Sequence, residues 1–124
     1  MVTVRMHNAD TAVAQLPTRV DYDNASVIGA QCQDLVRQGC STLVLDASQV
    51  EHLDSSGVSM IITLWRLLDD RTGTLRIAAL SAHYHHVWRI LGLDSLLPVC
   101  RTVRAALPAS VGMVAEGATD QRSP

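Results

Sequence analysis

Two adjacent hydroxyl side chains, Ser55 and Ser56, are the residues of this chain best placed to take part in chemistry. They stand between Asp54 and Gly57. An extended pattern at residues 50–53 precedes them and a helical pattern follows, so the hydroxyls are predicted at a helix N-terminus. Free backbone N–H groups and the positive end of the helix dipole favour an anion there. A serine at this place can accept a phosphate while its helix persists, because the new charge falls at the favourable end. Gly57 is expected to keep the first helical turn open to a partner.

An ordinary helix cap is the alternative explanation for the same residues. Ser and Asp are among the residues that most often accept hydrogen bonds from the first N–H groups of a helix. Capping is far commoner than phosphorylation, so these four residues alone favour the cap. A case for phosphorylation therefore needs support from other parts of the chain.

The helix predicted over residues 56–70 carries more apolar side chains than one buried face needs. Its inward stripe is predicted to comprise Val58, Ile61, Ile62, Leu64, Trp65 and Leu68. Met60 and Leu67 fall outside that stripe. Either a neighbouring helix covers them, or they belong to a protein-docking surface beside Ser56. The candidate partner-binding residues are Val58, Met60 and Leu67.

Strands and helices are predicted to alternate along the chain. The strand patterns cover residues 2–6, 11–16, 42–46, 50–53, 74–80 and 96–100, and the first alternates as a half-buried strand does. The helical patterns cover about 25–38, 56–70, 82–91 and 102–107. This alternation implies right-handed βαβ crossovers and a single α/β domain, which we place at residues 1–107. Residues 108–124 lack an apolar pattern and are expected to form a flexible tail.

Two short polar segments are predicted to join these elements. Residues 7–10 are turn-like and connect the first two strands as a hairpin. Asp21, Asp23 and Asn24 precede the first helix and supply the side chains that cap helix N-termini.

Composition argues against several classes of protein. The net charge is −2 and the chain has no lysine, so the basic face of a nucleic-acid binder is missing. The longest apolar-rich run, residues 58–68, contains Arg66 and is too short to cross a membrane. No secretory signal is recognisable near the first residue, and we expect a cytoplasmic protein without membrane contact. The three cysteines form no CxxC pair, which suggests ordinary reduced thiols. A redox switch is the alternative that would give them a function.

Three histidines invite a metal hypothesis, since His83 and His86 lie one helical turn apart with His85 between them. No cysteine or carboxylate nearby completes a ligand set, so no metal or other cofactor is predicted. The simpler explanation is the solvated face of the helix over residues 82–91. The buried side of that helix is predicted to contain Tyr84, Val87, Trp88 and Leu91.

The common signatures of an enzyme are missing. The chain contains no GxSxG, GxxxxGK or HExxH segment. Asp46 stands at a strand end, as the phospho-accepting aspartate of a receiver domain does. Receiver domains need a lysine near the phosphoryl group, and this chain has none. The sequence therefore predicts a protein that is not an enzyme.

Several segments in the right order resemble the STAS domain of bacterial anti-sigma factor antagonists, over about residues 11–107. Residues 43–46 and 50–58 resemble the strand, connector and phosphorylation motif of that family. Residues 80–82 and 90–99 are similar to its last helix, Gly-Leu turn and final strand. Asp21 falls where the family has the aspartate of its Gly-x-Leu-Asp segment. Together these motifs reverse the preference for a plain helix cap.

The resemblance implies a mixed β-sheet with about four helices packed on it, and a switch protein that regulates transcription. It implies phosphorylation at Ser56, with Asp21, Asp23, Asn24, Asp54, Ser55 and Gly57 around the site. The implied partners are an anti-sigma factor with GHKL-type serine kinase activity, bound when Ser56 is unphosphorylated, and a PPM-type serine phosphatase. A second class of function is an unphosphorylated STAS scaffold subunit of a signalling or lipid-transport complex. A metal or thiol sensor is the third.

Overall fold

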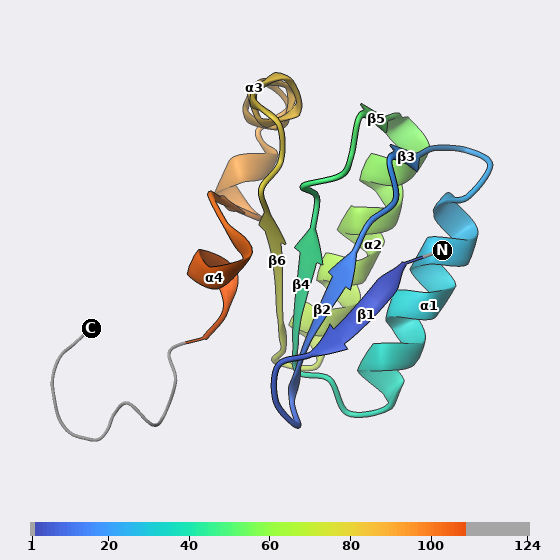
Figure 1. Ribbon diagram of the computed structural model, residues 1–124, viewed down its shortest axis with the longest axis vertical. Helices are drawn as coiled ribbons and strands as arrows, with labels where there is room; N and C mark the ends of the chain where they lie inside the picture. The colour runs from blue at the N-terminus through green and yellow to red at the C-terminus, as the bar shows by residue number, and fades with distance from the viewer. Residues whose placement is uncertain (1, 109–124) are drawn as a thin grey trace, which may run out of the picture.

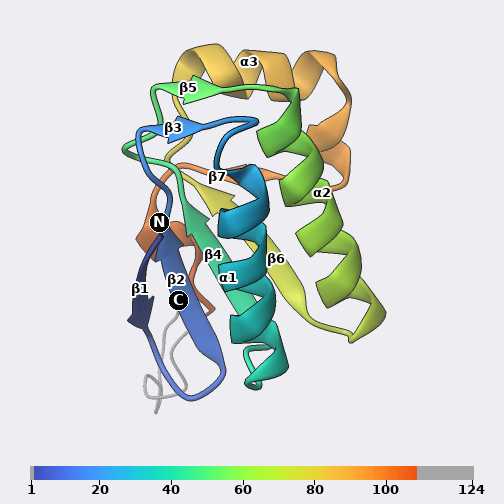
Figure 2. The ribbon, with the colours of Figure 1, turned by 90° about the vertical axis from the view of Figure 1, so that its right-hand side faces the viewer.

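A mixed sheet of five strands forms the centre of the protein in the computed structural model, which describes residues 2–108. The order across the sheet is β1-β2-β4-β6-β7; β1 is antiparallel to β2, and all other neighbours are parallel (Figures 1 and 2). The strands are β1 Thr3–Met6, β2 Thr11–Gln15, β4 Thr42–Asp46, β6 Thr74–Ala78 and β7 Val99–Cys100. A separate parallel pair is formed by β3 Arg19–Val20 and β5 His52–Leu53.

Helices cover both faces of this sheet, but unequally. α1 Ala25–Arg37 and α2 Ser55–Asp70 lie side by side on one face, as Figure 2 shows. α4 Val103–Ala106 lies on the opposite face, and α3 Ala82–Ile90 crosses the end of the sheet beside β5. A short 3-10 helix, Leu93–Ser95, follows α3. Among the described residues, no helix is long and apolar enough to span a membrane.

The central strand β4 shows why the sheet needs cover on both faces. Leu43, Val44 and Leu45 are each 0% exposed, which agrees with their nearly continuous apolar pattern. Leu43 and Leu45 belong to the larger core under α1 and α2. Val44 lies in a smaller cluster with Val13 beneath α4.

The hairpin β1-β2 confirms the predicted turn but not the predicted burial of its first strand. The Asn8 Oδ1 atom accepts hydrogen bonds from the N–H groups of Asp10 and Thr11, both at 2.9 Å. Every residue of β1 is exposed, however, including Val4 at 42% and Met6 at 53%. The prediction of a half-buried strand is therefore wrong. β1 is the edge of the sheet and lies beyond the cover of α1 (Figure 2).

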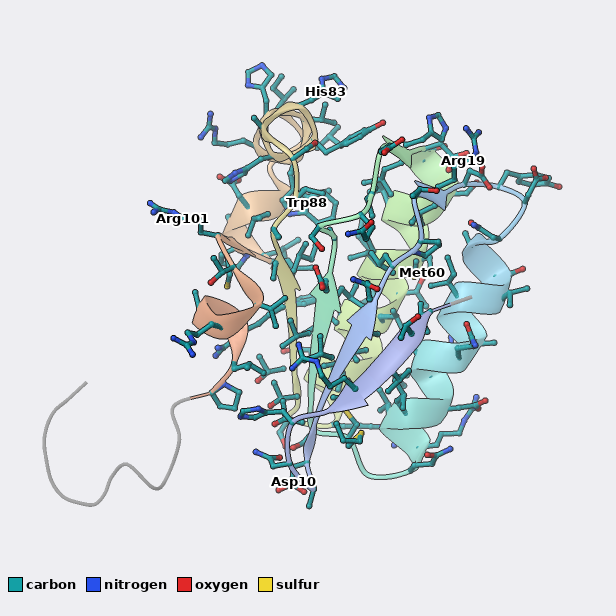
Figure 3. All side chains as sticks on the ribbon, viewed as in Figure 1. Asp10, Arg19, Met60, His83, Trp88 and Arg101 are labelled. Atoms are coloured by element: carbon teal, nitrogen blue, oxygen red, sulfur yellow. The ribbon has the colours of Figure 1, made fainter. Side chains whose placement is uncertain are left out.

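Helix α3 is buried along a narrower stripe than predicted. Trp88 is 1% exposed and points toward the sheet (Figure 3), where its Nε1–H donates to the Leu97 carbonyl at 3.0 Å. Tyr84 and Val87 are half-buried. The prediction is wrong for Leu91, which is the C-cap of the helix and is 56% exposed. The predicted tail, residues 108–124, lies outside the described residues from position 109 onward.

Candidate functional site

The N-terminus of α2 is built around the carboxylate of Asp54. This residue has extended backbone angles, and its Oδ1 atom accepts the N–H of Ser56 at 2.9 Å and that of Gly57 at 3.2 Å. The helix thus begins at Ser55, and the expected helix N-terminus is confirmed. Asp54 is the cap, so the Ser55 and Ser56 hydroxyls are not needed for that purpose.

Ser55 and Ser56 stand at a hollow of about 830 Å³ between the N-terminal halves of α1 and α2. Ser55 is exposed and Ser56 is half-buried. Within residues 2–108, the Ser56 hydroxyl has no hydrogen-bond partner. The lining of the hollow consists of Tyr22, Asp23, Ala25, Ser26, Gly29, Ala30, Gln33, Ser55, Ser56, Ser59, Met60 and Thr63. Most of these side chains are small, which leaves room beside the serines.

The loop before α1 stabilises itself instead of capping the helix as predicted. The Asn24 side chain accepts the N–H of Asp21 at 2.9 Å and donates to the Arg19 carbonyl at 2.7 Å, with no capping bond to α1. Asp21 is 8% exposed; it accepts the Arg19 Nε–H at 3.2 Å and the Asp23 N–H at 3.0 Å. Asp23 lines the hollow with Ser56, whereas Asp21 does not. The two acidic residues expected near Ser56 therefore have different surroundings.

A hydrogen bond joins this loop to the cap of α2. The second oxygen of Asp54, Oδ2, accepts the N–H of Tyr22 at 3.1 Å. Desolvation acts to raise the pKa of the Asp54 carboxyl, but its three N–H donors and the nearby His52 outweigh that effect. The pKa of Asp54 consequently lies below its usual value, and the group is a carboxylate at neutral pH. The position of Asp54 beside Ser56 follows from the sequence, whereas its contact with Tyr22 does not.

Gly57 faces the protein interior, which corrects the expectation that it keeps the helix open to a partner. It is buried, and a Cβ atom built on it would lie 2.5 Å from Leu53 Cδ1 and 2.9 Å from the Val20 carbonyl oxygen. Both distances are too short for a real side chain. The glycine is therefore required because the β3-β5 pair packs directly on the first turn of α2.

Helix α3 also contacts this region through a residue whose role was missed. The Tyr84 hydroxyl oxygen accepts the backbone N–H of Leu53 at 3.1 Å. That bond ties α3 to β5, whose Leu53 side chain packs against Gly57. The helical spacing of Tyr84 indicated an inward side chain, but nothing in the pattern identified its partner. His83 lies on the outer side of α3 (Figure 3).

The candidate partner-binding side chains of α2 are largely covered within the domain. Met60 is 8% exposed and lies on the side of α2 toward α1 (Figure 3), and a Cβ atom on Gly29 would lie 3.1 Å from its Cγ. Of the two alternatives for Met60, cover by a neighbouring helix is the one observed. Val58 and Leu67 are half-buried and pack on the core. A partner-binding role for Val58, Met60 and Leu67 stays a prediction.

The cysteines and histidines do not assemble into a recognisable metal site. No group of three His, Cys, Asp or Glu residues that could hold an ion occurs in the part of the chain that the structure describes. Burial and the neighbouring Cys40 raise the pKa of the Cys32 thiol to about 12. Such a thiol is protonated and unreactive at neutral pH.

The fold and the position of this site define an α/β domain whose serine-bearing helix N-terminus stands at a surface hollow. A family model described as "Mlab, STAS domain" matches residues 2–98, and the chain belongs to the STAS domain family. The mixed sheet and four helices confirm the predicted fold class.

Three similar proteins carry related descriptions. An anti-sigma F factor antagonist from Paenibacillus polymyxa is 20% identical over 94 residues, which cover 75% of this chain and 80% of that protein. The structure of an anti-sigma factor antagonist from Mycobacterium paratuberculosis matches with a TM-score of 0.76 at 24% identity, covering 86% of this chain and 89% of its own. The phosphorylated form of SpoIIAA, a Bacillus cell fate determinant, matches with a TM-score of 0.69 at 21% identity, covering 85% and 96%.

Proposed function

We propose that this protein is an anti-sigma factor antagonist that regulates transcription in a bacterium through phosphorylation of Ser56. Unphosphorylated, it binds an anti-sigma factor that is also a GHKL-type serine kinase, and thereby frees a sigma factor. Phosphorylation of Ser56 ends that binding, and a PPM-type phosphatase restores it. The protein itself catalyses nothing, needs no cofactor, and acts in the cytoplasm.

The observation that carries this proposal is the position of Ser56. Its hydroxyl is unbonded among the described residues, and it borders the hollow between α1 and α2. Because Asp54 already caps the helix, phosphorylation of Ser56 removes no capping bond made by its hydroxyl. The names of the similar proteins support the same role, since this chain matches most of one anti-sigma factor antagonist in sequence and most of another in structure.

Charge explains how phosphate would end partner binding. A phosphoserine adds about −1.5 to −2 charges at neutral pH. The helix N-terminus favours that anion inside the domain, so the fold is expected to survive. A partner surface shaped for a neutral hydroxyl would instead meet the phosphate together with Asp23 and the Asp54 carboxylate. Leaving such charge desolvated and unpaired costs several kcal/mol, and about 1.4 kcal/mol is tenfold in affinity.

The test is phosphopeptide mapping after incubation with candidate GHKL-type kinases and ATP. We expect phosphate on Ser56 in the wild type and in the S55A variant, and none in S56A. S56A should still bind the kinase, whereas S56D should bind at least tenfold more weakly and unfold like the wild type. Phosphate on Ser55 would overturn the assigned site. An absence of phosphate with every kinase would favour the scaffold function in a signalling or lipid-transport complex.

A further inference from the structure

Asp54 uses its two carboxylate oxygens for two different purposes. Oδ1 accepts both N–H groups of the α2 N-terminus, those of Ser56 and Gly57. Oδ2 accepts the N–H of Tyr22, a residue 32 positions earlier. Capping a helix needs one oxygen, which a serine or threonine can supply. The second oxygen is therefore free to bind the loop before α1.

That loop forms one wall of the hollow beside Ser56. Tyr22 and Asp23 line the hollow, and the Tyr22 side chain is 83% exposed, so little of it is held by packing. Inside the loop, Asp21 and Asn24 bond to each other and to Arg19. The Tyr22 N–H to Asp54 bond joins the Tyr22–Asp23 wall itself to the cap of α2. A second bond, from the Asp54 N–H to the Val20 carbonyl oxygen at 3.2 Å, holds the end of β3 beside it.

We propose that Asp54 is a positioning residue: it clamps the Tyr22–Asp23 wall to the start of α2 and so preforms the hollow in which a kinase meets Ser56. The effect on the kinase rests on the proposed function, while the clamp itself is a property of the free protein. A preformed wall lowers the ordering cost that the partner meets on binding. Loss of the clamp should therefore weaken docking more than it slows phosphate transfer.

Two substitutions separate the clamp from the cap. Asp54→Ser keeps one oxygen for the Ser56 and Gly57 N–H groups and removes the oxygen that reaches Tyr22. Asp54→Asn keeps the size of the side chain but can turn an NH2 group toward the Tyr22 N–H, where two donors oppose each other. The matched control is Asp23→Ser, which removes a carboxylate from the same wall; the Asp23 side chain makes no hydrogen bond among the described residues.

Amide hydrogen exchange measured by NMR on the free protein tests the clamp directly. In D54S and D54N, protection of the Tyr22 amide should fall about tenfold, as expected on losing one charge-assisted hydrogen bond, while the core amides of β4 keep theirs. D23S should leave the Tyr22 amide protected. Unchanged protection of Tyr22 in both Asp54 variants would overturn the clamp.

Steady-state phosphorylation by the cognate kinase tests the consequence. The KM of D54S should rise about tenfold, with kcat within about twofold of the wild-type value. A KM equal to that of the wild type, or a loss confined to kcat, would overturn the positioning role. If wild-type Ser56 is not phosphorylated at all, the proposed function fails, and the exchange result still decides whether Asp54 clamps the loop.

Discussion

Gly57 and Val20 lie so close together that a Cβ atom on Gly57 would be 2.9 Å from the Val20 carbonyl oxygen. The two residues are far apart in the sequence, yet this contact sets the start of α2 against β3. Tyr84 does not touch this contact. Its hydroxyl oxygen accepts the N–H of Leu53 and so holds β5, the partner strand of β3. The β3-β5 pair thus packs against the helix turn that carries the candidate phosphorylation site.

Replacement of Gly57 by alanine should destabilise the protein by about 1–3 kcal/mol, because the new methyl group overlaps backbone as well as a side chain. Gly29→Ala is the matched control. Its methyl group would meet only the flexible Met60 side chain at 3.1 Å, and alanine favours a helix over glycine by about 1 kcal/mol. Urea denaturation should therefore show G29A close to the wild type. Equal stability of G57A and G29A would contradict the contact.

Leu64→Ala should lower the free energy of unfolding by about 2–5 kcal/mol, since Leu64 is 0% exposed in the core beneath α2. Leu91→Ala removes the same atoms from a side chain that is 56% exposed and should cost less than about 1 kcal/mol. Chemical denaturation of both variants provides the measurement. A wild-type curve for L64A would mean that α2 turns another face inward.

The stability of the protein should fall in acid partly through Asp54. Its pKa is lower in the folded protein than in the unfolded chain. The stabilisation that the ionised Asp54 adds to the folded protein is therefore fully present above the ordinary aspartate pKa of about 3.9. It is lost as the pH falls through the lower folded-state pKa. Melting temperatures measured between about pH 6 and pH 2 should decline less steeply for D54N than for the wild type. Parallel profiles would show that the three N–H bonds do not favour the carboxylate.

Native-state alkylation should distinguish the cysteines. With its pKa at about 12, Cys32 is ionised in roughly one molecule in ten thousand at pH 8, and it is also fully buried. Cys100 is half-buried and should react with iodoacetamide first, as measured by peptide mass spectrometry. All three thiols should react in denaturant. Labelling of native Cys32 as fast as Cys100 would mean that its part of the core opens readily.

Apart from the short strand β3, which was not predicted, the order of elements and the position of the site could be predicted from local patterns. Helical spacing placed Leu64 and Leu68 inside, and both are buried. The start of α2 was predicted to within one residue, at 56 instead of Ser55, because a helix N-terminus is decided by side chains within a few residues of it. The resemblance to a family extended these local signals to the whole α/β fold, which the structure confirms.

The surroundings of the site were decided only by the tertiary structure. Periodicity shows which way a side chain points, but not what covers it, so the cover of Met60 by α1 could not be read from α2 alone. The inward orientation of Gly57 depends on β3, and the Asp54 clamp depends on Tyr22, 32 residues away. Contacts of this kind form between segments that approach only when the chain folds, because their geometry is set by the packing of whole elements and not by local preference.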